Sequence, residues 1–147
     1  MTCFVGYHGS ISRVEKFSAQ RRQRSEYGDG FYFTDDFATA ERYGPVVGRY
    51  KICFRRPLHA HQFTLGDILA GRSGQALPSR LRDQGTWITQ TAQALGYDGL
   101  VLTLASGQRY FVAFLPSQVR LVQEGPSPKV RTARAVRGRI GGWTSAF

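Results

Sequence analysis

The sequence predicts a single α+β domain, and three observations carry this prediction. The chain has 147 residues, a length at which one domain can bury a substantial core. Its composition is 41% apolar and 13% aromatic, which is not the composition of a disordered chain. Short stretches typical of strands are interspersed with short segments typical of helices.

The chain is expected to begin with a strand and a basic segment. An apolar strand is predicted over residues 2–7, and it ends at a histidine, a glycine and a serine. Residues 12–23 are expected to form a helix or an irregular segment rich in arginine. Glycines within residues 28–30 supply the backbone freedom that a turn needs, and the aromatic residues 31–33 follow as a second strand.

The next predicted helix has signals at both ends. Residues 34–36 hold three side chains that can cap a helix N-terminus, so a helix is predicted over residues 37–43. A Gly-Pro pair ends this helix, because proline cannot continue the helical hydrogen bonds. Apolar and more polar residues then alternate over residues 48–54, which predicts a third strand that Pro57 ends.

The second half of the chain predicts two helices followed by three strands. The helices are expected over residues 63–70 and 78–95, with a glycine-containing loop between them. A strongly apolar strand at residues 100–104 and an aromatic strand at residues 109–115 flank a short Ser-Gly-Gln loop, which predicts a hairpin. A last strand is expected over residues 119–122.

The C-terminal end of the chain is more basic than the rest. Residues 1–123 are interpreted as one domain, and residues 124–147 as a basic C-terminal extension that begins with a linker rich in Gly and Pro. The extension is either a loose tail or an arm for a polyanion. The formal net charge of the whole chain is +10, and most of its cations are arginines. This charge favours an anionic partner, namely a phosphate-bearing cofactor, a nucleic acid or an acidic protein, with solubility as the plainer alternative.

Cysteine and histidine usage predicts no metal site, because the two cysteines and three histidines lack metal-ligand spacing. Cys3 and Cys53 are each expected to be small buried apolar residues, and a disulfide between them stays open. No apolar run approaches the roughly 18 residues that span a membrane, and no signal peptide is seen at the N-terminus. We therefore expect no membrane partner, and a protein that is cytoplasmic or that another device or a larger parent protein delivers into a target cell.

Candidate binding residues gather around two turns. A glycine at position 9 lets a planar amide approach backbone groups, and His8 can donate to or accept from a sugar hydroxyl. Tyr32 and Tyr43 lie on either side of a strand-to-helix turn, where two aromatic rings can enclose a flat heterocycle. If the heterocycle is positively charged, cation–π attraction adds about 0.5–2 kcal/mol. Taken singly, each residue also has an ordinary interpretation as a packed or surface side chain.

The combined spacing resembles that of the diphtheria-toxin-like ADP-ribosyltransferases, a superfamily that includes the poly(ADP-ribose) polymerases and many bacterial and phage toxin domains. The matching segments are Tyr7-His8-Gly9-Ser10, Gly28-Asp29-Gly30-Phe31-Tyr32-Phe33-Thr34-Asp35, and Tyr43, eleven residues after Tyr32. Residues 96–101 and 110–119 resemble the final strands of that fold, so the resemblance covers about residues 4–122. It implies two small, bent antiparallel sheets facing each other, helices outside them and an NAD⁺ cleft between them.

The resemblance also assigns roles to residues. It implies that His8 binds the ribose 2′-hydroxyl of NAD⁺, that Gly9 and the adjoining Ser10 offer binding groups to the nicotinamide end, and that Tyr32 and Tyr43 flank the nicotinamide ring. The reaction would displace nicotinamide from C1′ of the ribose, and binding geometry supplies most of that catalysis. The positive charge that could help to hold the pyrophosphate comes from Arg13, Arg21, Arg22 and Arg24.

One departure from the family pattern concerns the third signature residue, which is often a glutamate at the start of the late strand. Counting back from Gln118-Val119 without gaps places Tyr110 there, and a shift of one or two residues would place Arg109 or Gln108 there instead. None of these is a carboxylate that could activate an acceptor hydroxyl as a general base. Elongation of an ADP-ribose chain is therefore not expected.

A second departure lies three residues before the second tyrosine, where the family often has a serine that binds the carboxamide. That position is Ala40, and the neighbouring Thr39 is the candidate replacement. Thr39 is therefore counted among the residues that bind NAD⁺. The candidate catalytic residues are His8, Tyr32 and Tyr110.

The sequence therefore predicts a mono-ADP-ribosyltransferase that transfers ADP-ribose from its substrate NAD⁺ to a protein or nucleic-acid acceptor, as a bacterial toxin or effector domain would. One alternative is a catalytically inactive relative that binds NAD⁺ or nucleic acid. Another is hydrolysis of NAD⁺ without transfer. The resemblance to toxins leaves room for an immunity or antitoxin protein as a further partner.

Overall fold

The computed structural model describes residues 1–11 and 27–123. The predictions made for residues 12–23, for the arginines at positions 13 to 24 and for the extension 124–147 lie outside the described residues. The elements in chain order are β1 (Thr2–Ser10), β2 (Phe31–Thr34), α1 (Phe37–Tyr43), β3 (Val46–Phe54), β4 (Pro57–His61), α2 (Leu65–Ser73), α3 (Leu81–Ala94), β5 (Gly99–Thr103), β6 (Arg109–Ala113), η2 (Pro116–Gln118) and β7 (Val119–Gln123).

The strands form one seven-stranded sheet in the order β4-β5-β6-β2-β1-β3-β7. This α+β architecture is confirmed, whereas two separate antiparallel sheets are not what the backbone pairing shows. Strand β1 pairs with β3 along its whole length, but it pairs with β2 only where Tyr7 lies opposite Thr34. The sheet is therefore continuous, with a narrow joint between β2 and β1.

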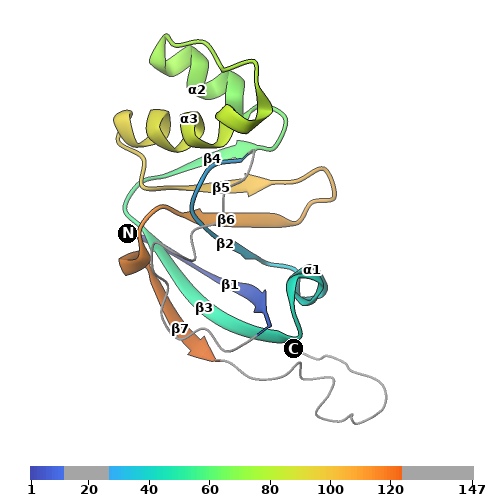
Figure 1. Ribbon diagram of the computed structural model, residues 1–147. Coiled ribbons are helices and arrows are strands. Elements are labelled where there is room, and N and C mark those ends of the chain that lie inside the picture. Colours follow the sequence, from blue (N-terminus) through green and yellow to red (C-terminus); the bar gives the residue numbers. More distant parts are fainter. Residues whose placement is uncertain (12–26, 124–147) are drawn as a thin grey trace.

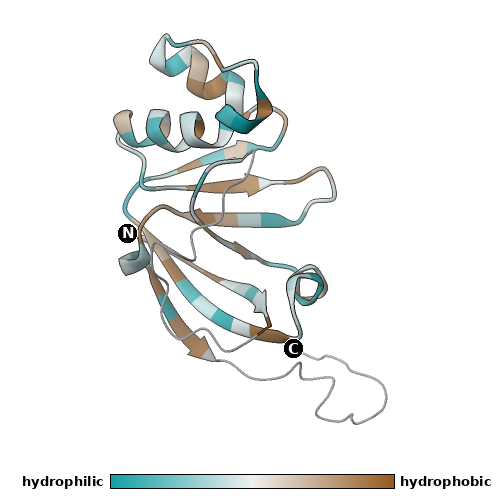
Figure 2. Cartoon of the chain, viewed as in Figure 1, coloured by the Kyte–Doolittle hydropathy of each residue, from teal (hydrophilic) through white to brown (hydrophobic). Residues whose placement is uncertain are grey.

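A first cluster of buried side chains lies inside the bend of the sheet. Its members are Phe31, Phe33, Tyr50, Ile52, Phe54, Val101, Phe111 and Ala113. Strand β3 is three places from β6 in the sheet, so contact between their side chains requires the sheet to curl over this cluster. Strand β3 contributes every second residue, which confirms the alternation predicted there and appears as changing bands along the strand (Figure 2).

A second cluster fills the space between the other face of β5 and β6 and the helices α2 and α3, which lie together beside β4 (Figure 1). Leu100, Leu102 and Val112 enter this cluster, whereas Val101 and Phe111 enter the first one. Strands β5 and β6 are thus buried on both faces, which explains why residues 100–104 are so strongly apolar.

Strand β4 was not predicted, because Pro57 was interpreted as the end of a strand. The structure instead starts β4 at Pro57 and pairs it in parallel with β5. A proline is tolerated as the first residue of an edge strand, where a missing N–H group removes no essential ladder bond. The parallel pairing follows from the long connection through α2 and α3, because only such a crossover can join parallel neighbours.

Helix α2 also extends beyond its predicted end. Gly71 was expected to begin a loop, but the helix continues to Ser73 and ends where Gly74 takes a left-handed backbone conformation with φ of 74°. Glycine is the residue that most readily adopts this conformation at a helix C-terminus. No helix among residues 1–11 and 27–123 is both long and apolar enough to cross a membrane.

The expectation that the cysteines are buried apolar residues is wrong. Cys3 and Cys53 form a disulfide between β1 and β3, where they are direct register partners. Cys3 is exposed and Cys53 is partly buried. The pairing could not be read from the sequence, because it depends on the register between two strands that lie fifty residues apart.

Candidate functional site

The end of strand β1 is packed against the backbone of helix α1. A Cβ atom on Gly9 would lie 1.8 Å from the carbonyl oxygen of Ala40, and one on Gly44 would lie 2.2 Å from the carbonyl carbon of Ser10. No real Cβ atom approaches another atom so closely, so both positions require glycine. On the side where its Cβ would stand, Gly9 makes room for α1 and not for a ligand. Ser10 is held in the same contact.

Three tyrosines meet beside this contact. The Tyr43 and Tyr110 hydroxyl oxygens lie 3.4 Å apart, and the Tyr32 and Tyr110 rings meet edge to face with centroids 6.2 Å apart. The Tyr32 hydroxyl donates to the carbonyl oxygen of Gly28 at 2.5 Å. Tyr43, at the end of α1, is 59% exposed, so its ring can contact a ligand from solvent. Tyr110 thus connects the two predicted ring-binding tyrosines.

The register of β6 places Tyr110 and Arg109, two of the three candidates for the late-strand position, on opposite faces. Thr34 pairs with Tyr110 and Tyr32 pairs with Val112, so these side chains share one face. Arg109 points to the other face, where its Nε lies 3.1 Å from a carboxylate oxygen of Asp35. Tyr110 is therefore the residue that faces the tyrosine cluster.

The environment of Tyr110 keeps its hydroxyl neutral. Burial is the largest cause that raises the pKa of Tyr110 well above its usual value, followed by the hydrogen bond and charge of Tyr43. The neighbouring charges that act on it are those of Tyr43, Tyr27 and, in the opposite direction, Arg42. Tyr110 can therefore donate or accept a hydrogen bond, but it does not offer an anionic base at neutral pH.

His8 is fixed by a backbone contact. Its Nδ1 donates to the carbonyl oxygen of Tyr32 at 3.2 Å, and its ring lies 5.7 Å from that of Phe33 and 6.2 Å from that of Tyr50. A carbonyl can only accept, so Nδ1 carries the hydrogen and Nε2 is the acceptor of the neutral ring. His8 and Tyr32 are thus joined through the main chain, while their side chains pack with different neighbours.

Thr39 lies buried between α1 and the β5–β6 loop. The Asp36 carboxylate caps α1 by accepting from the Thr39 N–H at 3.2 Å and from the Thr39 hydroxyl at 2.5 Å. The Thr39 hydroxyl oxygen also lies 3.0 Å from the Gln108 amide. One hydroxyl hydrogen cannot serve two acceptors, so this geometry is satisfied when the Gln108 amide turns its NH₂ group toward Thr39. The capping predicted for residues 34–36 is confirmed at Asp36.

The turn before β2 is anchored to helix α3, a connection that sequence reasoning missed. The Asp29 N–H donates to the Thr89 hydroxyl at 2.8 Å, and the Thr86 hydroxyl donates to the Asp29 carboxylate at 3.0 Å. Gly28 has φ of 118°, a conformation that L side chains rarely adopt. Thr86 and Thr89, which lie on the predicted helix 78–95, were the available signal. This anchor fixes the carbonyl that accepts from Tyr32.

The described part of the chain offers no metal-binding group, because nowhere in it do three His, Cys, Asp or Glu side chains come together in a suitable arrangement. The arrangement instead combines neutral hydroxyls, one imidazole and aromatic rings. Such groups can hold sugar hydroxyls and a flat ring.

The comparisons with known proteins give a family match and a structural neighbour. The family model of ADP-ribosyltransferases in polyvalent proteins matches residues 2–126. A solved structure of an anti-CRISPR protein is similar over 82% of this chain and 96% of its own length, at 16% sequence identity and a TM-score of 0.47. The search of curated proteins finds no match.

Proposed function

This chain belongs to the ADP-ribosyltransferases found in polyvalent proteins, and from that premise we propose that it transfers a single ADP-ribose unit from NAD⁺ to a macromolecular acceptor. The observation that carries the proposal is the contact of Tyr32, Tyr43 and Tyr110, with His8 hydrogen-bonded to the Tyr32 main chain, in a chain whose family uses NAD⁺ as substrate.

Each of these residues suits one part of NAD⁺. The exposed Tyr43 ring can lie against the nicotinamide, whose positive charge adds cation–π attraction. The Nε2 atom of His8, the acceptor in the neutral ring, can accept from a ribose hydroxyl. Thr39 is a buried residue of α1, the helix that ends at Tyr43, and it can take the place of the serine that the family often has at the position of Ala40. Its hydroxyl must then exchange one of its present contacts.

The chemistry is a substitution at C1′ of the nicotinamide ribose. The C1′–N bond breaks, nicotinamide leaves with the bonding electrons, and the acceptor forms a bond to C1′ and gives up its proton. The residues of this chain orient the ribose and the leaving ring, which is where binding geometry lowers the barrier. Because Tyr110 stays neutral, it can hold a sugar hydroxyl but cannot take the acceptor's proton as a carboxylate would. This supports transfer of one unit and not elongation.

The acceptor is proposed to be a protein or a nucleic acid, as the net charge of +10 suggests. The proposal includes a toxin or effector role, in the cytoplasm or in a target cell, and an immunity or antitoxin protein that would neutralise it.

The test uses labelled NAD⁺ and a cell lysate, followed by protease or nuclease treatment to identify the labelled macromolecule. Wild type should label an acceptor, and His8→Ala should abolish labelling while retaining the fold. The matched control is His59→Ala, because His59 is exposed on β4, away from the tyrosines. If wild type and His8→Ala are equally inert toward protein, RNA and DNA, the enzyme proposal fails.

A second candidate function is NAD⁺ binding without turnover. It is favoured because Tyr110 stands at the position where the family often has a glutamate. In that case NAD⁺ binds to wild type, binding weakens in Tyr43→Ala, and neither nicotinamide nor labelled product is formed. Release of free ADP-ribose with no labelled acceptor would instead indicate hydrolysis.

A further inference from the structure

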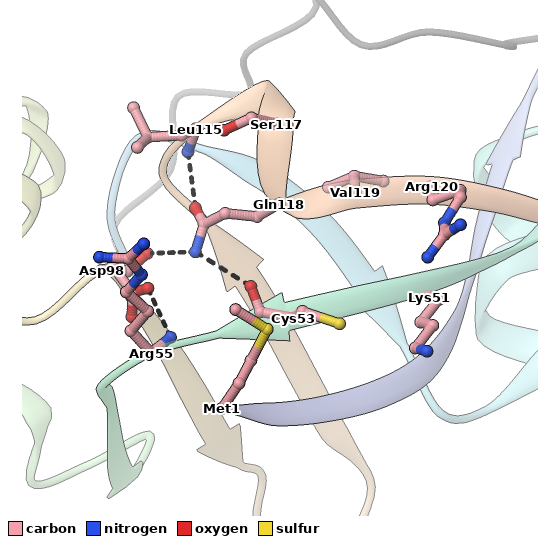
Figure 3. A pocket seen from close by; sticks show the side chains of 10 residues that line it. All are labelled: Met1, Lys51, Cys53, Arg55, Asp98, Leu115, Ser117, Gln118, Val119 and Arg120. Atoms are coloured by element: carbon pink, nitrogen blue, oxygen red, sulfur yellow. Dashed lines mark hydrogen bonds between the residues drawn. The ribbon is translucent and has the colours of Figure 1, made fainter.

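A pocket of about 550 Å³ opens near the Thr2 end of β1, on the outer side of strands β3 and β7. Its lining residues are Met1, Lys51, Cys53, Arg55, Asp98, Leu115, Ser117, Gln118, Val119 and Arg120 (Figure 3). None of them belongs to the candidate site described above, since His8 lies toward the other end of β1.

Two of the pocket's cations lie directly opposite each other. Lys51 of β3 and Arg120 of β7 are register partners, so their side chains lie side by side on one face of the sheet and both line the pocket (Figure 3). Like charges at directly opposed positions destabilise a pair of strands. The ion pair found among residues 1–11 and 27–123 joins Arg109 to Asp35, so no described carboxylate neutralises Lys51 or Arg120. An anion bound between them would remove this repulsion.

The acidic residue in the pocket is already engaged. The Asp98 carboxylate accepts from the backbone N–H groups of Arg55 at 2.7 Å and Arg56 at 3.0 Å. Gln118 is fixed as well, because its NH₂ group donates to the Asp98 carbonyl at 3.0 Å and its oxygen accepts from the Leu115 N–H at 2.8 Å. These hydrogen bonds engage the Asp98 carboxylate and the Gln118 amide, so the side chains of Lys51, Arg55 and Arg120 are the groups of the pocket that remain for a ligand.

The positive charge continues beyond the pocket along β3. Arg49 lies two residues before Lys51 and shares its face of the strand, roughly 6.8 Å away at ordinary strand spacing. Its Nε is buried with no hydrogen-bond partner in the described structure. Arg49 and Lys51 thus lie in a row on β3, Arg55 continues the row directly after the strand ends at Phe54, and Arg120 lies beside Lys51 on β7. A row of cations suits a partner with regularly repeated negative charges better than one small anion.

We propose that this row, which we call the β3–β7 cationic face (Arg49, Lys51, Arg55 and Arg120), binds the phosphate backbone of a nucleic-acid strand, with one phosphate seated in the pocket. Arginine supports this choice, because its guanidinium group binds phosphate through two parallel hydrogen bonds. Phosphate contacts of this kind give binding that depends little on base sequence and strongly on salt.

The test measures binding of a fluorescein-labelled single-stranded DNA oligonucleotide to the full chain by anisotropy, without NAD⁺, so its outcome does not depend on transferase activity. Lys51→Gln/Arg120→Gln should bind about tenfold more weakly at low salt. The slope of log K against log salt should fall by roughly 1.4, which corresponds to two lost phosphate contacts on a single strand.

The matched control is Arg80→Gln/Arg82→Gln, which removes the same charge from exposed positions at the start of α3. This variant should bind within about twofold of wild type. Equal losses in both variants would show that only total charge matters and would overturn the proposal. Absence of binding by wild type would overturn it too, as would competition by poly-glutamate as effective as that by unlabelled DNA, since the face would then fit an acidic peptide.

Discussion

Strand β1 is joined to the rest of the molecule differently at its two ends. At the His8–Ser10 end, the backbone of α1 lies against Gly9 and Gly44 lies against Ser10, with no room for a single added carbon. At the Thr2 end, a covalent bond joins Cys3 to Cys53 of β3, and the neighbouring pocket is lined by cations, two of which are register partners.

Because of this difference, substitutions at the two ends of β1 should have different effects on stability and activity. At the packed end, atomic fit holds the residues proposed to bind NAD⁺, so a disturbance there should affect stability and activity together. At the other end, the disulfide and the cations lie away from the candidate site and do not pack against it. Changes there should alter stability or polyanion binding and leave transfer intact. The predictions below test this separation.

The largest expected effect comes from opening the disulfide. It closes a loop of about fifty residues, and its loss should lower the free energy of unfolding by about 4 kcal/mol through the greater entropy of the unfolded chain. Thermal unfolding with and without reductant measures this effect. Below the new melting temperature, the labelling of acceptor should stay within about twofold, because His8 lies at the other end of the strand.

The double variant Cys3→Ser/Cys53→Ser serves as its control. These are the chain's two cysteines, so the variant should unfold at the same temperature with or without reductant. A reductant effect of similar size in that variant would contradict the disulfide as the cause.

The next largest effect is expected from Gly9→Ala. The added methyl group would collide with the Ala40 carbonyl, and either β1 or α1 must shift, at a cost of about 3 kcal/mol. Labelling of acceptor should fall together with the stability, because a shift of α1 also moves its last residue, Tyr43, which is proposed to contact the nicotinamide.

Gly71→Ala is the matched substitution for this prediction. Gly71 lies within α2 with no atom near its Cβ position, so alanine should stabilise the helix by about 0.5–1 kcal/mol. If Gly9→Ala unfolds at the wild-type temperature and keeps activity, the close contact with α1 does not hold this end.

The two ends also differ in how far the sequence predicts them. Helix α1 was predicted over its full observed range, because its capping residues and its Gly-Pro stop are local signals. The close approach of α1 to Gly9 was not predicted, since a local signal for glycine does not reveal which group approaches it. The disulfide and strand β4 depend on register and on a distant parallel neighbour, which no local pattern contains.

A smaller effect should appear at high pH in Tyr110→Phe. The folded state raises the pKa of Tyr110 above the value of about 10 expected for an unfolded tyrosine. The unfolded state therefore loses this proton first, and the stability that Tyr110 contributes is complete below about pH 10 and is lost as the pH rises above it. The free energy of unfolding should fall more steeply with pH in wild type than in Tyr110→Phe.

Denaturant unfolding between about pH 8 and 11 measures this difference in slope. Tyr7→Phe is the matched control, because it removes a tyrosine hydroxyl outside the cluster of Tyr32, Tyr43 and Tyr110, from a ring that packs against Phe37. Identical slopes in wild type and Tyr110→Phe would show that the hydroxyl is not held neutral by its surroundings.

The smallest expected effect concerns the repulsion across β3 and β7. Arg120→Gln should raise the free energy of unfolding by a few tenths of a kcal/mol, because the charge opposite Lys51 is removed while a polar side chain is kept. The gain should disappear when Lys51→Gln is already present, and it should shrink in high salt, which screens exposed charges. Chemical denaturation of the two single variants and the double variant gives this coupling directly. An equal gain in both backgrounds would show that Arg120 acts alone, and the argument that an anion relieves the pair would lose its basis.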